Sequence, residues 1–437
     1  MRAPTINDPR LPALLDRAGL VSMLLTVPLL LHARGVAEAT MAVTGLCFLG
    51  RSWALRDWSW LRTPWVILGT AWLVWLILCS TPIPALGLGE GGWNSFGQAV
   101  MTVRFLLFAA AMEFALLRNG SARRWLFGLV AAAAAYIAAN CVFQFVVGRN
   151  LYGWPRYGEG ELTGPFGMPR AGPPLARILL PSILPPVAAW LARPGLPARF
   201  GAYGLLLASV VVMVLIGQRM PLLLTIGGLL VVAVLLPQLR KVVLVAGVAI
   251  ALLLAASPVI APKAYNRLVV KFSTQMEHFA SSHYGLLYTR GLEIGLRHPI
   301  TGLGFDGFGT GCGQPAYFRP SFDGREPEGG GARICWVHPH NYFVQAMTDG
   351  GFIGLALFSA LSVAWLIALG RGLWQRPNAL RIGLFASMAV QIWPIQSTTG
   401  FMALPLAGWF FLLLGWGLAL ARYPDPVEPD APDARMP

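Results

Sequence analysis

The sequence predicts an all-α, polytopic integral membrane protein with about 12 transmembrane helices. Three observations predict this class: 56% of the 437 residues are hydrophobic, only 12% are charged, and long apolar runs recur along nearly the whole chain. Soluble domains carry about 25% charged residues, roughly twice this share. A helix needs about 20 largely apolar residues to cross the hydrocarbon core of a bilayer, and many of these runs reach that length.

Twelve apolar runs predict the individual helices. The first nine lie within residues 1–260 and the last three within 345–422, with the long segment 261–344 between them. We expect the helices at 18–33, 37–50, 64–84, 100–117, 125–147, 174–192, 200–217, 220–236, 242–260, 345–369, 382–400 and 404–421. Only the four residues from Gly217 to Met220 divide the seventh run from the eighth.

The basic residues predict which helix ends face the cytoplasm. The formal net charge is +14, but the arginines lie singly or in pairs between apolar runs, so they form no continuous basic face for a nucleic acid. The helix count places most of them on one side, which the basic bias of short loops identifies as the cytoplasm. These residues are Arg2, Arg10, Arg17, Arg51, Arg56, Arg62, Arg118, Arg123, Arg124, Arg193, Arg199, Arg240, Lys241, Arg371, Arg376 and Arg381. We therefore expect both termini in the cytoplasm.

The opposite, extracytoplasmic side carries the segments that favour a function. A loop at 148–173, the turn at Arg219 and the segment 261–344 lie there, and the last is far longer than an ordinary connection. Long surface loops of this kind commonly carry function. The acidic, Pro-rich residues 423–437 predict a disordered cytoplasmic tail. The triplet Ala37-Glu38-Ala39 leaves a second interpretation of the first run, as a cleaved signal peptide.

The cysteines agree with this layout. Cys47, Cys79 and Cys141 lie in apolar runs, where a thiol packs as a small hydrophobic group. Cys312 and Cys335 are the two cysteines of the long outer segment, and an oxidising compartment favours a disulfide between them. The alternative is two reduced cysteines with accidental spacing.

The densest polar cluster is Val337-His338-Pro339-His340-Asn341-Tyr342, where the outer segment re-enters the membrane. A metal site usually needs three or four ligands, and no further histidine lies nearby in the sequence. A neutral imidazole acting as a general base near pH 7 is the better functional interpretation. The structural alternative is an interfacial histidine that caps the next helix.

Four arginines predict a second constellation in the same outer layer. Arg219 lies at the turn, Arg104 near the outer end of the fourth run, Arg177 near the start of the sixth, and Arg290 in the long segment. Buried guanidinium groups normally face a cavity with an anionic partner. Several of them together suggest a pyrophosphate site, because their forked donors match phosphate oxygens. Taken singly, each could instead extend its side chain to the lipid headgroups.

Other patterns carry weaker signals. The turn from Gly302 to Gly309 follows no predicted strand, so we expect a tight turn against the bilayer surface and no dinucleotide site. Two pairs of carboxylates lie on the outer side, and each could hold a divalent cation or remain solvated loop charge. These pairs are Glu159 with Glu161 and Glu326 with Glu328.

Three short patterns together resemble the O-antigen ligase and polymerase superfamily. Arg290 precedes His298-Pro299-Ile300-Thr301-Gly302-Leu303-Gly304, which is similar to the family's P-x-x-G-x-G pattern. The long outer loop then leads to His338-Pro339-His340-Asn341, its H-x-H-N pattern, and to Asp349-Gly350-Gly351-Phe352-Ile353-Gly354 at the start of the next helix. The twelve-run layout and the turn at Arg219 also resemble the ligase branch.

The resemblance implies a glycosyltransferase of the C-type membrane fold in the bacterial inner membrane, with its active site facing the periplasm and with no metal or cofactor. It implies undecaprenyl-diphosphate-linked O-antigen as the donor and a sugar hydroxyl of lipid A–core as the acceptor. By position, His338 would be the catalytic base, and Arg219 and Arg290 would bind the donor diphosphate. We expect Arg104 and Arg177 to contribute to that site, and His340, Asn341 and Asp349 to support it.

Other functions stay open. An O-antigen polymerase would join two lipid-linked glycans, and a protein O-oligosaccharyltransferase of the same superfamily would use a Ser or Thr acceptor. A transporter for a polyprenyl-linked glycan is an alternative of a different class. Transporters commonly show internal repeats and charged groups at the bilayer midplane, whereas this chain shows no repeat and gathers its candidate residues at one face.

Overall fold

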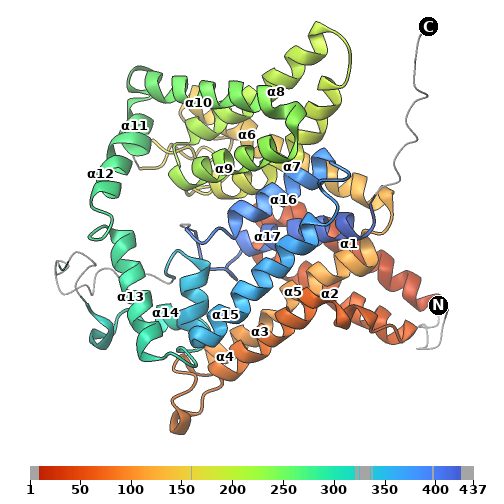
Figure 1. Ribbon diagram of the computed structural model, residues 1–437, viewed down its shortest axis with the longest axis vertical. Coiled ribbons are helices and arrows are strands. Elements are labelled where there is room, and N and C mark those ends of the chain that lie inside the picture. The colour runs from red at the N-terminus through yellow and green to blue at the C-terminus, as the bar shows by residue number, and fades with distance from the viewer. Residues whose placement is uncertain are drawn as a thin grey trace.

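The computed structural model describes residues 9–158, 160–319, 324, 335, 338–395 and 398–424. Within these ranges the regular structure is helical, and no β-strand occurs (Figure 1). The expected tail at 423–437 therefore lies almost entirely outside the described residues.

A helix occupies each of the twelve predicted runs. Seven helical segments in the described ranges are long and apolar enough to cross a membrane, so the chain is a multi-pass membrane protein and the predicted fold class is confirmed. Four more apolar helices are shorter. The twelve are α1 (Leu11–His32), α2 (Arg34–Leu55), α3 (Pro64–Ser80), α4 (Gly92–Met101) continued by α5 (Val103–Ala111), α6 (Gly120–Val147), α7 (Gly172–Leu191), α8 (Leu196–Ile216), α9 (Arg219–Leu235), α10 (Arg240–Ile260), α15 (Tyr342–Gly370), α16 (Ala379–Gln391) and α17 (Leu406–Arg422).

The eleventh helix is shorter than predicted. The apolar run suggested 382–400, but α16 ends at Gln391. Pro394 explains the stop, because proline lacks the N–H of a helix interior, clashes with the preceding turn and disfavours the α conformation of the residue before it. The described residues that follow, 392–395 and 398–405, are non-helical and lead to α17; we call them the non-helical return.

The long outer segment is partly helical. After α10 come α11 (Pro262–Tyr265), the π-turn η5 (Asn266–Val270) and α12 (Lys271–Glu277), which form an arm along one side of the molecule (Figure 1). The amphipathic α13 (His283–Arg297), α14 (Gly307–Gly311) and η6 (Pro315–Tyr317) follow; α13 and α14 pack beside α15, and η6 packs against α13.

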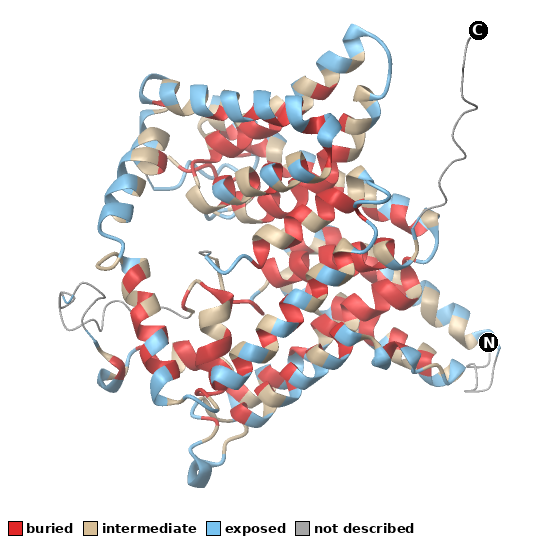
Figure 2. Ribbon diagram, in the orientation of Figure 1, coloured by how far each residue is buried: buried red, intermediate tan, exposed pale blue. Residues whose placement is uncertain are grey.

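The core surrounds α17, every residue of which from Leu406 to Leu420 is buried (Figure 2). A helix buried on all sides belongs at the centre of a bundle. Around it, α15 packs against α3, α16 against α7, and α5 against α17. Phe401, just before α17, places its ring 4.8 Å from that of Tyr342 and 5.0 Å from that of Phe358. This aromatic cluster anchors the non-helical return to α15.

The far end of α17 carries charged groups. Arg422 Nε donates to Glu113 Oε1 at 2.7 Å, and Trp65 Nε1 donates to Glu113 Oε2 at 2.8 Å. The guanidinium of Arg118 lies 5.7 Å from the ring centre of Tyr423. Connections that carry arginines therefore meet at the end of the bundle opposite to Leu406.

Candidate active site

The segment from His338 to Tyr342 leads into α15, and Asn341 is its N-cap. Asn341 Oδ1 accepts hydrogen bonds from the backbone N–H groups of Phe343 at 2.9 Å and Val344 at 3.1 Å. A side-chain amide is well suited to this position, because it satisfies N–H groups that have no partner within the helix. Capping is therefore performed by Asn341, which leaves His338 free of that structural role.

The non-helical return forms hydrogen bonds with the segment from His338 to Tyr342. His340 adopts a positive φ of 57°, and its Nδ1 lies 2.9 Å from the carbonyl oxygen of Thr398. Thr398 N–H donates to the His340 carbonyl at 2.9 Å, and Asn341 Nδ2 donates to the Pro394 carbonyl at 2.7 Å. Sequence reasoning missed this contribution because residues 392–400 formed part of a predicted apolar span. Pro394 and Gly400 were the available signals.

His338 differs from its neighbours in having no partner. Its ring centre lies 4.6 Å from that of His340, and its buried Nε2 makes no hydrogen bond with any residue in the described ranges. Burial, with a smaller contribution from His340, lowers the pKa of the His338 imidazole to about 4. The ring is therefore neutral at pH 7, and one of its nitrogens can accept a proton. Nε2 can therefore form a hydrogen bond with a group that enters the site.

A cavity of about 480 Å³ lies beside His338, a size typical of small-molecule sites. It is formed at the end of the bundle where α2, α7 and α17 begin. Its polar lining comprises Arg34, Gln98, Arg170, Asp306, His338, Gln345 and Thr399. Arg34, Arg170 and Asp306 were not predicted as site residues, because a single charged residue in an outer loop carries no distinguishing sequence signal.

Asp349 holds together two of the glycine-rich patterns. Its buried Oδ1 accepts from Gly307 N–H at 2.9 Å, and its backbone carbonyl accepts from Gly304 N–H at 3.1 Å. The turn from Gly302 to Gly309 therefore packs against α15, and its expected position at the bilayer surface stays a prediction. A Cβ at Gly302 would lie 2.4 Å from the Thr348 carbonyl oxygen, so a close backbone approach explains the glycine. The same packing places Asp306 in the cavity wall.

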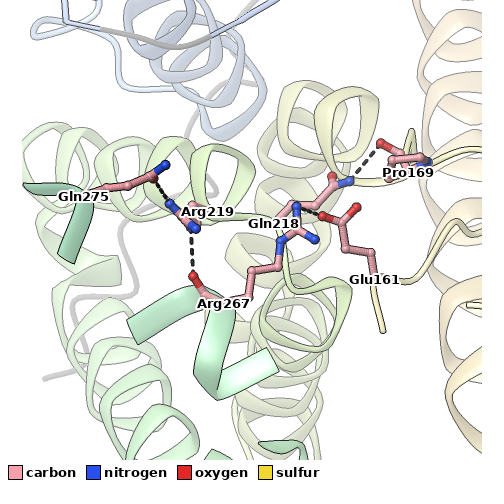
Figure 3. A network of polar contacts seen from close by, with 6 residues as sticks. All are labelled: Glu161, Pro169, Gln218, Arg219, Arg267 and Gln275. Carbon is pink, nitrogen blue, oxygen red and sulfur yellow. Dashed lines mark hydrogen bonds and ion pairs between the residues drawn. The ribbon is translucent and has the colours of Figure 1, made fainter. Parts of the chain in front are cut away.

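Arg219 belongs to a polar network at the start of α9 (Figure 3). Its Nε donates to the Arg267 carbonyl at 2.8 Å, and its Nη1 donates to Gln275 Oε1. The Arg267 side chain forms an ion pair with the buried Glu161. Arg219 therefore joins α9 to the arm of α11, η5 and α12.

Arg290 also contacts other groups of the protein. The side chain is buried in α13, its Nη1 donates to the Cys312 carbonyl, and its guanidinium lies 4.1 Å from the ring centre of Phe318. Cys312 forms a disulfide with Cys335, with their Cα atoms 5.2 Å apart. Arg290 thus supports the loop that the disulfide closes.

The remaining predicted arginines differ from each other. Arg177 is buried, and its Nη2 lies 3.3 Å from both Tyr342 Oη and Thr398 Oγ1, so it joins α7 to the histidine motif and the return. Arg104 instead forms an ion pair with Glu38 at 3.4 Å. Of these two, only Arg177 contacts the candidate site.

The carboxylate pairs do not assemble a cation site in the described part of the chain. Glu161 is paired with Arg267, while Glu159, Glu326 and Glu328 lie outside the described residues. Among the described residues, no group of three or more His, Cys, Asp and Glu side chains is arranged to hold a metal ion.

Comparison with known proteins places part of this architecture in a family. Residues 204–359, from α8 through the first half of α15, match the family described as O-Antigen ligase. The resemblance that the sequence suggested is confirmed over this range, which contains Arg219, Arg290 and His338. A search of curated proteins finds no match.

Proposed function

We propose, from the match of residues 204–359 to the family described as O-Antigen ligase, that the chain transfers O-antigen from undecaprenyl diphosphate to a sugar hydroxyl of lipid A–core. The reaction takes place at the periplasmic face of the inner membrane. The observation that carries the proposal is the unpartnered His338 Nε2 beside a cavity with two cationic side chains.

In this proposal His338 is the general base. The acceptor hydroxyl donates its proton to the imidazole as its oxygen attacks the anomeric carbon of the donor sugar. The bond from that carbon to the phosphate oxygen breaks, undecaprenyl diphosphate leaves with the electron pair, and the anomeric configuration is inverted. The chemistry requires no metal, because cationic side chains can stabilise the leaving charge.

Binding of the donor is proposed to raise the pKa of His338. A pKa of about 4 makes His338 a weak proton acceptor at neutral pH. A diphosphate in the same cavity favours the imidazolium form and raises this pKa towards the working pH. His338 therefore becomes a better base when the donor is bound.

Arg219 and Arg290 are proposed diphosphate ligands, as the family implies. Each donates to a protein carbonyl, so binding requires that this contact be exchanged for phosphate oxygens. Arg177 is proposed to position the histidine motif through Tyr342 and Thr398. Arg104 would have to leave Glu38 to take part.

The test is transfer by purified protein, with lipid-linked O-antigen and lipid A–core in the presence of a chelator. We expect wild type to join polymer to the core and His338→Ala to lose at least about a hundredfold in rate, the usual contribution of a general base. A folded His338→Ala protein with full activity would exclude this base. Polymer that lengthens without any core acceptor would identify a polymerase, and loss of wild-type activity in chelator would exclude a metal-free reaction.

A further inference from the structure

The two cationic side chains of the cavity beside His338, Arg34 and Arg170, have so far been given no individual role. Arg34 is the first residue of α2, and Arg170 ends the loop between α6 and α7. Both line the cavity with His338. Unlike Arg104, Arg177, Arg219 and Arg290, neither guanidinium has a hydrogen bond or ion pair with another described residue.

The loop that carries Arg170 is held in place by buried amide groups. Asn150 Nδ2 donates to the Gly164 carbonyl at 2.7 Å, and Gln144 Oε1 accepts from Thr163 N–H at 2.8 Å. Directly before Arg170, the Pro169 carbonyl accepts from Gln218 Nε2 at 2.8 Å (Figure 3). The backbone of this arginine is therefore fixed while its side chain is exposed. Such preorganisation reduces the entropy cost of binding.

The other walls indicate the chemical class of the ligand. They are apolar and are formed by Pro173, Pro174, Met402, Leu404, Pro405 and Leu406. Guanidinium groups match phosphate oxygens, whereas an apolar wall at the end of a membrane bundle suits a hydrocarbon chain. Together they fit an amphiphile with a phosphate head better than a soluble phosphate.

We propose that Arg34 and Arg170 bind the diphosphate of the polyprenyl donor next to the bond that breaks. This inference rests on the proposed function, and its geometry follows from the reaction. The base must lie about 3 Å from the acceptor oxygen, and that oxygen about 3–3.5 Å from the anomeric carbon. The leaving phosphate is on the opposite side of that carbon, so it must occupy the cavity that His338 lines. Arg34 and Arg170 reach this place without giving up a protein partner.

The experiment measures the affinity of the full-length protein in detergent for undecaprenyl diphosphate without an acceptor. We expect Arg34→Gln and Arg170→Gln each to weaken binding roughly tenfold or more, the value of a charged hydrogen bond. Arg34→Lys and Arg170→Lys should recover part of it. Arg149→Gln is the matched control, because Arg149 is exposed on the same loop but does not line the cavity.

The outcomes separate this inference from the proposed function. If the folded Gln variants bind the lipid as tightly as wild type, the inference is wrong even where wild type transfers glycan. If they lose binding while wild type transfers nothing to lipid A–core, the inference stands and the proposed function fails. Tight binding of inorganic pyrophosphate that does not depend on the lipid would exclude the amphiphile as the ligand, as would a wild-type protein that binds no undecaprenyl diphosphate.

Discussion

At the residue scale, His338 and His340 lie side by side but have different environments. His340 is fixed by the Thr398 carbonyl, whereas Nε2 of His338 has no partner in the described ranges. Burial is the main cause that lowers the pKa of both rings to about 4. The pair therefore combines an oriented ring with one that is available to a substrate.

These shifts predict that the two histidines destabilise the native state in acid. Both folded pKa values lie below the ordinary value of 6.5, so between pH 6.5 and about 4 the unfolded chain binds protons that the native protein does not. The contribution of the two histidines to the free energy of unfolding therefore falls as the pH falls through this window. The measurement is the apparent melting temperature in detergent at pH 7 and pH 4.5, and we expect this acid shift to be less destabilising in His338→Gln than in wild type.

The comparison with the variant is needed because Asp306 acts in the opposite direction. Burial raises the pKa of its carboxyl from 3.8 to about 6, so its protonation favours the native state as the pH falls. Asp306 contributes equally in wild type and in His338→Gln, so subtracting the pH dependence of one melting temperature from that of the other removes the contribution of Asp306. An equal pH dependence in the two proteins would contradict the shift assigned to His338.

At the element scale, glycines allow the turn from Gly302 to Gly309 to pack against α15. Gly302 has a φ of 58°, and Gly351, at the kink of α15, has a φ of 67°. A Cβ at Gly351 would lie 2.3 Å from the Ile300 carbonyl oxygen. The glycine-rich segments 302–309 and 349–354 therefore contact each other through their backbones.

This contact predicts a severe effect of a small substitution. Gly302→Ala introduces a left-handed alanine against the Thr348 carbonyl and should cost about 2 kcal/mol or more. Thermal unfolding in detergent is the measurement. Gly128→Ala is the matched control, because Gly128 lies within α6 with nothing within 4 Å of an added Cβ, and alanine favours a helix. A melting temperature of Gly302→Ala equal to that of the control would exclude the close contact.

The elements also show how far local sequence patterns predict the structure. Each predicted apolar run contains a helix, because length and hydropathy are local properties. They did not predict the fold of 392–405, where Phe401 packs into the aromatic core and Thr398 binds His340. That path depends on contacts with α15, which lies some 50 residues earlier in the chain. For the same reason the motif predicted His338 as a candidate, whereas Arg34 and Arg170, which line the same cavity, became candidates only in the folded structure.

At the scale of the whole molecule, the bundle has two chemically different ends. Leu406 at the start of α17 lines the cavity, and Arg422 at the other end of α17 is paired with Glu113. Arginine-bearing connections gather at the second end, as the positive-inside bias requires of a cytoplasmic face. We therefore expect the cavity end to be periplasmic, which is where lipid-linked glycan would be transferred in the proposed function.

This orientation predicts opposite labelling at the two ends of α7. Arg149 and Arg193 are both exposed, one before the loop that leads into α7 and the other directly after that helix. With Cys47, Cys79 and Cys141 replaced by Ala to remove the free thiols, we expect Arg149→Cys to react with a membrane-impermeant maleimide added to the periplasmic side of cells. Arg193→Cys should react only after the inner membrane is opened, and the parent without an introduced cysteine gives the background. Reaction of Arg193→Cys in cells with an intact inner membrane would mean that the true orientation is the reverse of the expected one. The His338 cavity would then face the cytoplasm, where the proposed transfer to lipid A–core could not occur.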